Sequence, residues 1–258
     1  MLTLKVKEKL NIHVIGAGGT GGYAISYLAR LLAGGEHVIH VYDGDMVETK
    51  NLKRQNFSLD DLDKNKAIAI CDYVKTTVHQ APKMIAHTDY ITDKDDLMID
   101  IVSELEADQS LIIVLAVDNV ATRRLVNEMV MTDLVEAQIP TIMLDSGNDN
   151  QGGQVVLYAN APVTWTQPFG TPEKGMLQTM LQIFPDIDKI VDENPGLVQN
   201  CAENAESEPQ AMLANVRNGE VIAQNIVRIL ENHKAPGNVW RSDILTGNTT
   251  CKFTGFGG

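Results

Sequence analysis

Residues 11–31 place a short apolar run, a glycine-rich turn and a helical stripe in direct succession, and this order limits the fold more than any other feature of the chain. The apolar run at 11–15 is typical of a buried strand. It leads into a turn whose glycines are Gly16, Gly18, Gly19 and Gly21. Apolar residues then recur at helical spacing. A strand, a glycine turn and a helix in this order predict a nucleotide-binding unit, whose turn offers backbone N–H groups to a phosphate.

The alternation of strands and helices continues along the first 159 residues. Further apolar runs predict strands at 37–42, 84–87, 111–117, 141–144 and 154–158. Helical stripes lie between them, from residue 63 and around 126–134. Such alternation predicts an α/β fold: a doubly wound, Rossmann-like, mostly parallel sheet with helices on both faces.

The C-terminal part of the chain has a different pattern. Six of the nine prolines fall between residues 160 and 210, where helical periodicity is weak, so this stretch is interpreted as a crossover segment. A helical stripe near 215–230 and a hairpin over 239–256 follow. We expect one domain over 1–258, with a Rossmann-like nucleotide-binding half at 1–159 and a crossover segment, helix and hairpin at 160–258.

Composition excludes several classes of protein. The formal charge of −13 argues against a nucleic-acid surface, which normally carries a basic patch. No stretch approaches the roughly 18 apolar residues of a membrane span, and the first residues form no leader-like apolar run. Cys71, Cys201 and Cys251 form no C-x-x-C pair, so neither a disulfide framework nor a four-cysteine zinc site is expected. These features favour a cytoplasmic protein without membrane or nucleic-acid partners.

Carboxylates stand where predicted strands end. Asp43 follows the second strand, 22 residues beyond Gly21, the usual place for a carboxylate that binds ribose hydroxyls. Asp118 follows the apolar run at 111–117. Because the carboxyl ends of parallel strands meet at one edge of a sheet, these groups should lie near the glycine turn. So far an NAD(P)-dependent oxidoreductase fits as well as an ATP-binding protein.

The next polar residues separate the two alternatives, because cations aimed at a phosphate have no role in hydride transfer. Arg54 and Lys66 lie within a series that reads D-x-D-x-V at 43–47, N-L-x-R-Q at 51–55, Asp118-Asn119 and finally Gly153-Gln154. In this order and spacing, over about residues 11–158, the chain resembles the ThiF/MoeB-type activating enzymes. That family includes the adenylation domains of ubiquitin-activating enzymes. Without C-x-x-C pairs, the chain resembles its small, zinc-less members.

The resemblance implies ATP-dependent adenylation of the C-terminal glycine of a ubiquitin-like or sulfur-carrier protein, with ATP and Mg²⁺ bound. Arg54 would then clamp the phosphates, Lys66 would place a compact cation near the transferring group, and Asp118 would hold Mg²⁺. The implied nucleotide-binding residues are Gly16, Gly18, Gly19, Gly21, Asp43, Asn51, Arg54, Gln55, Lys66 and Asn119. The family also leads us to expect a homodimer.

Some members of the family pass the acyl group to a cysteine in the crossover, and Cys201 lies there as a candidate nucleophile. Neighbouring glutamates count against it, since like charge disfavours a thiolate. Cys71, on the apolar stripe of its predicted helix, is expected in the core. Two alternatives to adenylation stay open at this point: an NAD(P)-dependent oxidoreductase, and a catalytically silent ThiF-like binding protein.

Overall fold

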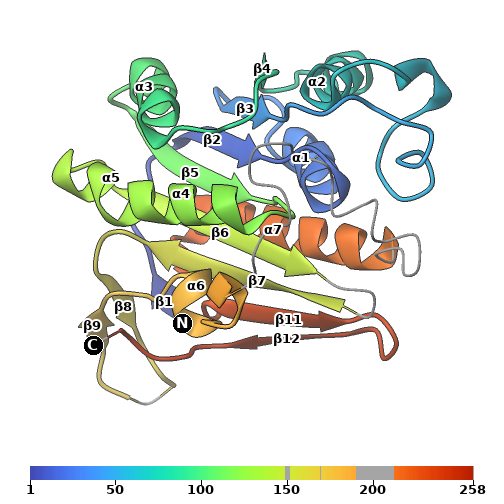
Figure 1. Ribbon diagram of the computed structural model, residues 1–258. Coiled ribbons are helices and arrows are strands. Elements are labelled where there is room, and N and C mark those ends of the chain that lie inside the picture. The colour runs from blue at the N-terminus through green and yellow to red at the C-terminus, as the bar shows by residue number, and fades with distance from the viewer. Residues whose placement is uncertain (149–151, 169, 190–211, 258) are drawn as a thin grey trace.

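An eight-stranded sheet forms the centre of the computed structural model, which describes residues 1–148, 152–168, 170–189 and 212–257. The strands lie in the order β12-β11-β7-β6-β5-β2-β3-β4 (Figure 1). Their bounds are β2 (Lys9–Ile15), β3 (Val38–Tyr42), β4 (Lys83–His87), β5 (Gln109–Leu115), β6 (Thr141–Asn148), β7 (Gly152–Ala159), β11 (Val239–Asp243) and β12 (Asn248–Lys252).

Strand pairing changes from parallel to antiparallel at one place in this sheet, between β6 and β7. β4, β3, β2, β5 and β6 run parallel, whereas β7, β11 and β12 are antiparallel to their neighbours. The order β5-β2-β3 contains the reversal of winding at which such sheets bind ligands. The predicted doubly wound, mostly parallel sheet and the terminal hairpin are confirmed.

Helices cover both faces of the sheet, as predicted. One layer contains α1 (Gly19–Leu31), α2 (Lys66–Thr77) and α7 (Met212–Asn232), and α7 packs along α1. The other contains α3 (Lys94–Glu104), α4 (Val120–Met131) and α5 (Asp133–Glu136) (Figure 1). A parallel strand between two such layers must be apolar on both sides. Leu111 to Leu115 in β5 are accordingly all 1% exposed or less.

A second, four-stranded sheet has the order β10-β1-β8-β9. It joins β1 (Leu2–Thr3) to β8 (Val163–Trp165), β9 (Glu173–Gly175) and β10 (Lys234–Ala235). The sequence predicted no regular structure in the described part of the crossover, which in fact contains β8, β9, α6 (Met180–Ile183) and the 3₁₀ turn η2 (Ile187–Lys189). Elements of three or four residues are too short to display a hydrophobic period.

Two helices differ from the sequence prediction. The helix expected from residue 63 begins at Lys66, because Asp63 has a φ of 62° and Asn65 is the N-cap. α3 was not predicted, since it buries only Leu97 and Ile101 and its stripe is weak. Within the described residues, no helix is both long enough and apolar enough to cross a membrane.

Candidate active site

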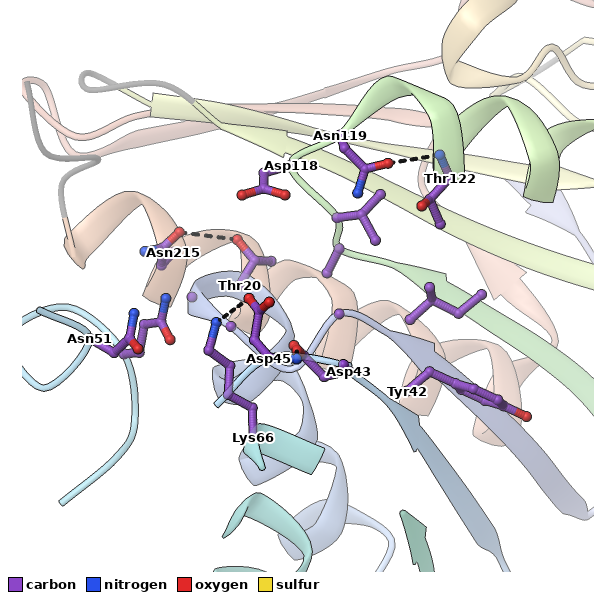
Figure 2. A pocket seen from close by; sticks show the side chains of 18 of the residues that line it. Thr20, Tyr42, Asp43, Asp45, Asn51, Lys66, Asp118, Asn119, Thr122 and Asn215 are labelled. Atoms are coloured by element: carbon purple, nitrogen blue, oxygen red, sulfur yellow. Dashed lines mark hydrogen bonds and ion pairs between the residues drawn. The ribbon is translucent and has the colours of Figure 1, made fainter. Parts of the chain in front are cut away.

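A pocket opens where the carboxyl ends of β2, β3, β5 and β6 meet α1, α2 and the start of α7 (Figure 2). It brings together most of the residues singled out in the sequence. Those that line it are Gly16, Gly18, Gly19, Asp43, Asn51, Arg54, Gln55, Lys66, Asp118 and Asn119. Gly21 lies just outside, where α1 passes so close to the carbonyl oxygen of Gly16 that a side chain would clash with it.

The glycine turn follows β2 and begins α1. Gly16 has a φ of 94°, a left-handed conformation that favours glycine, and a Cβ there would clash with the carbonyl oxygen of Ala116. No side chain caps the start of α1 at Gly18. The first N–H groups of the helix therefore face the pocket with the positive end of the helix dipole, which favours an anion.

One side of the pocket carries paired charges, and we call Asp43, Asp45 and Lys66 the charged wall. Lys66 Nζ lies 2.7 Å from Asp45 Oδ2 (Figure 2). Tyr90 donates to Asp45 Oδ1 at 2.6 Å. Asp43 accepts hydrogen bonds from the backbone N–H groups of Ala17 at 2.8 Å and Asp45 at 2.9 Å. Burial raises the pKa of Asp43, and the positive charge of Lys66 opposes that rise.

Asn65 fixes the charged wall to α2. Its Oδ1 caps the helix by accepting from the N–H groups of Ala67 and Ile68, at 2.9 and 3.3 Å. Its Nδ2 donates to the carbonyl oxygens of Asp43 and Asp45, at 2.8 and 3.2 Å. The sequence analysis missed this residue, although an asparagine directly before a helical stripe is a common N-cap signal.

The segment around Asn51 presents the second cation. Asn51 Oδ1 accepts from the N–H of Glu48 at 2.8 Å, and its carbonyl oxygen accepts from the N–H groups of Arg54 and Gln55. Asn51 therefore shapes the turn that aims the next side chains. The half-buried Arg54 guanidinium forms no ion pair with the described residues. Gln55 Oε1 is buried without a hydrogen-bond partner among them.

The opposite side of the pocket is neutral, and we call Thr20, Asn148 and Asn215 the amide wall. Asn215 Oδ1 accepts from Thr20 Oγ1 at 3.3 Å (Figure 2). It also accepts from Asn148 Nδ2. These residues come from α1, β6 and α7. The sequence analysis predicted no site residue on α7 or β6, because no local motif joins segments so far apart.

A buried ion pair supports the sheet beneath the amide wall. Arg123 of α4 pairs with Asp145 of β6, and both side chains are buried. Arg123 Nη2 also donates to the carbonyl oxygens of Val117 at 2.9 Å and Ser146 at 3.2 Å. Burial lowers the pKa of Arg123 to about 10. This pair, which the sequence analysis also missed, ties the ends of β5 and β6 together.

Asp118 and Asn119 follow β5 but differ in their surroundings. Asn119 Oδ1 caps α4 by accepting from the N–H of Thr122 at 2.8 Å (Figure 2). Asp118 is exposed at the rim and makes no hydrogen bond or ion pair to a described residue. Its carboxylate is therefore available to a ligand.

Three histidines stack beneath the charged wall. His13 and His40 lie ring on ring, with centroids 4.3 Å apart, and His40 Nδ1 lies 3.1 Å from His87 Nε2. Tyr42 Oη lies 2.9 Å from His13 Nδ1, and this tyrosine also lines the pocket. Burial holds the pKa of His13 well below its ordinary value and lowers that of His40 to about 4. The stack is therefore neutral at pH 7.

The cysteines fall into two groups. Cys201 lies outside the described residues. Cys71 is in the core, as expected, and Cys251 lies on β12. Burial raises the pKa of each of these two thiols to about 11, so neither is readily ionised at neutral pH.

The donor set of the pocket fits a magnesium nucleotide. An uncapped helix start, the Arg54 guanidinium, which pairs with no described carboxylate, and the ammonium of Lys66 suit phosphates. Carboxylates nevertheless outnumber cations among the described lining residues: Asp43, Asp45, Glu48, Asp89 and Asp118 against Lys50, Arg54 and Lys66. A divalent ion on Asp118 would reduce that excess, and Mg²⁺ commonly binds one carboxylate together with phosphates and water. No cluster of three or more histidine, cysteine or acidic side chains suited to a metal occurs in the described ranges.

A doubly wound sheet with this pocket at its carboxyl edge is the architecture typical of α/β nucleotide-binding proteins. The chain belongs to the ThiF family, whose model matches residues 3–254. This is a family of ATP-dependent adenylating proteins related to ubiquitin-activating enzymes. The recognition made from the sequence is confirmed.

Individual relatives are distant. The chain is 32% identical over 95 residues to the ATP-dependent ubiquitin transferase-like protein Cap2 of Escherichia coli (strain TW11681), covering 36% of this chain and 16% of Cap2. It is 37% identical over 71 residues to Cap2 of Vibrio cholerae serotype O1 (strain ATCC 39315 / El Tor Inaba N16961), covering 27% and 12%. Only a small part of these curated relatives is therefore matched.

Solved structures resemble the chain more completely. E. coli MccB with MccA-N7isoASN has a TM-score of 0.63 at 20% identity, over 96% of this chain and 66% of MccB. E. coli MccB with ATP has a TM-score of 0.61 at 21% identity, over 96% and 64%. PaaA has a TM-score of 0.61 at 17% identity, over 94% and 63%. At these identities the likeness shows the fold, and the chain spans about two thirds of each.

Proposed function

We propose that this protein uses Mg-ATP to adenylate the C-terminal glycine of a ubiquitin-like or sulfur-carrier protein. The observation that carries the proposal is that Arg54 and Lys66 line one pocket with the uncapped start of α1. A pocket that only held a dinucleotide would not need two cations near the phosphates. Family membership and the ATP named with MccB agree with the proposal.

In the proposed reaction, a carboxylate oxygen of the carrier attacks the α-phosphorus of ATP. The bond from that phosphorus to the β-phosphate bridging oxygen breaks, and pyrophosphate leaves. Two anions approach one another, so Arg54 and Lys66 stabilise the charge that develops. Asp118 would hold Mg²⁺, which would supply positive charge to the phosphates. Asp43 binds the ribose, and Asn51, Gln55 and Asn119 keep the surrounding turns in place.

Residues 1–159 would supply the nucleotide site and residues 160–258 the carrier-facing segment of one domain, which we propose acts as a homodimer. If the acyl group then moves to a thiol, Cys201 is the proposed acceptor, because the buried Cys71 and the half-buried Cys251 both have raised pKa values. The thiolate would attack the acyl carbonyl carbon and AMP would leave. Intact mass should then show a reductant-sensitive carrier adduct that Cys201→Ala abolishes.

Calorimetry with Mg-ATP and with NAD tests the proposal most directly. Lys66→Ala is compared with Lys64→Ala, a matched control whose exposed side chain pairs with Asp61 away from the pocket. We expect wild type and Lys64→Ala to bind Mg-ATP and Lys66→Ala to bind it more weakly. Binding of NAD that is unaffected by Lys66→Ala would instead support an oxidoreductase. If the wild type binds neither Mg-ATP nor NAD, the result would support a binding protein without catalysis.

Catalysis needs its own measurement, which is exchange of labelled pyrophosphate into ATP in the presence of glycine-ended carriers. We expect exchange to depend on the carrier's last glycine and to fall roughly 100- to 1,000-fold in Lys66→Ala. Exchange at the same rate with carriers that lack this glycine would contradict the proposed substrate.

A further inference from the structure

Asn215 occupies a place in the pocket that neither the sequence motifs nor the proposed chemistry uses. It lies in the first turn of α7, is 2% exposed and lines the pocket beside the glycine turn. One turn later, Gly219 lies so close to α1 that a Cβ would come 2.9 Å from both Ala24 N and Tyr23 Cβ. This close helix packing gives the Asn215 side chain a fixed position.

Its neighbours determine which way the amide faces. Asn215 Oδ1 accepts from Thr20 Oγ1 and Asn148 Nδ2, and Asn148 Nδ2 also lies 3.5 Å from Thr20 Oγ1. In this orientation the Asn215 NH₂ group points away from those donors. No acceptor in the described part of the chain takes a hydrogen bond from it. Relative to the described residues, the buried Asn215 side chain thus presents an unused donor at the pocket.

The free donor lies directly over the glycine turn. A Cβ on Gly19 would clash with Nδ2, Cγ and Oδ1 of Asn215, so the amide lies against the backbone at the start of α1. The N–H groups there face the pocket. The N–H of Ala17 is not available to a ligand, because it donates a hydrogen bond to Asp43. An anion bound at the start of α1 would therefore lie between the helix N–H groups and the Asn215 amide.

We propose that Asn215 is a further binding residue of this site, whose Nδ2 donates a hydrogen bond to a phosphate oxygen of the nucleotide on the glycine turn. The inference rests on the proposed function, because it requires a nucleotide phosphate in this pocket. The same arrangement explains the glycine at position 19. A residue without a side chain leaves room for the Asn215 amide as well as for the ligand.

Binding of Mg-ATP and of adenosine, which lacks phosphate, tests the proposal in the full-length chain. Asn215→Ala should weaken Mg-ATP binding about 10- to 100-fold, the range for a hydrogen bond to a charged group. Adenosine affinity should stay within about twofold. Asn215→Asp keeps the size and the acceptor oxygen but replaces the donor with a negative charge, so it should weaken Mg-ATP at least as much. This second variant keeps the test valid if Asn215→Ala does not fold.

Asn225→Ala is the matched control. Asn225 lies on the same helix, is also 2% exposed and donates to the Val221 carbonyl oxygen at 2.7 Å, outside the pocket lining. Its loss should leave the ratio of ATP to adenosine affinity unchanged. Equal losses of affinity for Mg-ATP and adenosine in Asn215→Ala would mean that Asn215 only shapes the pocket. Unchanged affinity for both would mean that Asn215 does not contact the ligand. Either result would overturn this inference and leave the proposed function standing. A wild-type protein that does not bind Mg-ATP would overturn the proposed function as well.

Discussion

The charged wall and the amide wall face each other across one pocket but hold their polar groups in different ways. In the charged wall, Lys66 already has a carboxylate partner in Asp45. In the amide wall, neutral groups saturate the acceptor of Asn215, and none of the described acceptors pairs with its donor. A ligand phosphate must therefore compete for Lys66, whereas the donor of Asn215 is available at once. The comparison teaches that charge alone does not indicate which side of a site is ready to bind.

The largest change in stability is expected beneath the amide wall. Arg123→Leu would leave Asp145, which is 0% exposed, as an unpaired buried carboxylate. We expect the free energy of unfolding to fall by about 3 to 5 kcal/mol, measured by urea denaturation. Replacing both residues, Arg123→Leu with Asp145→Leu, should recover much of the loss. A single variant within about 1 kcal/mol of wild type would contradict this assignment.

Beneath the charged wall, the histidine stack should respond to acid. The pKa of His40 is about 4 in the folded protein, against an ordinary value of 6.5, so the unfolded chain binds protons first. Stability is thus complete above pH 6.5 and falls as the pH drops towards 4, by about 3 kcal/mol for this group. Asp100 and Glu104 of α3, which act on His87, and Lys83 also surround the stack.

Urea denaturation between pH 7 and pH 4 measures this dependence. His40→Gln should flatten the profile, whereas the exposed His79→Gln serves as the control and should leave it unchanged. A His40→Gln profile as steep as that of wild type would assign the acid response to other groups.

Gly19→Ala should show how tightly the amide wall lies on the glycine turn. The added methyl group clashes with Asn215, so we expect a loss of about 1 to 3 kcal/mol in unfolding free energy without nucleotide. Asn215→Ala in the same chain should relieve part of that loss. Gly18→Ala is the control, because its methyl group would make ordinary contact with the Gln55 side chain, at 3.5 Å from Nε2. Strictly additive losses in the double variant would disprove the contact.

The smallest effect is expected at the edge of the charged wall. Tyr90→Phe removes the hydrogen bond to Asp45 Oδ1 and should cost about 1 kcal/mol in thermal or urea unfolding without nucleotide. Tyr73→Phe offers a comparison, since the Tyr73 hydroxyl accepts from Arg30 Nη2 at an exposed site. A loss in Tyr90→Phe no larger than that in Tyr73→Phe would mean that Asp45 relies on Lys66 alone.

The charged wall could be predicted from the sequence because it lies within 24 consecutive residues, 43–66. Asp43 is placed at this pocket by the end of its strand, and Lys66 by the order of the motifs. The ion pair between Lys66 and Asp45 could not be foreseen, because a pattern of residues does not show which charges neutralise each other. The sheet was predictable for a related reason: its parallel strands are long apolar runs.

The amide wall could not be predicted in the same way. Thr20 and Asn215 are separated by 195 positions and meet only after α7 packs on α1. A buried asparagine on a helix carries no sequence signal that separates a ligand contact from a helix contact. The two- and three-residue strands of the small sheet were not predicted because they are too short to show a hydrophobic period. The helix α3 was not predicted because it buries only two side chains.

The ion pairs around the pocket have a consequence for the way salt affects nucleotide binding. Among the described cations of the lining, Lys50 lies 2.8 Å from Glu48 and Lys66 lies 2.7 Å from Asp45, which leaves Arg54 without a carboxylate partner. When a phosphate replaces Asp45 on Lys66, one anion is exchanged for another and the number of ion pairs stays the same. Dissolved ions screen both pairs alike. Affinity should therefore depend on ionic strength as though the pocket held one cation, Arg54, and not three.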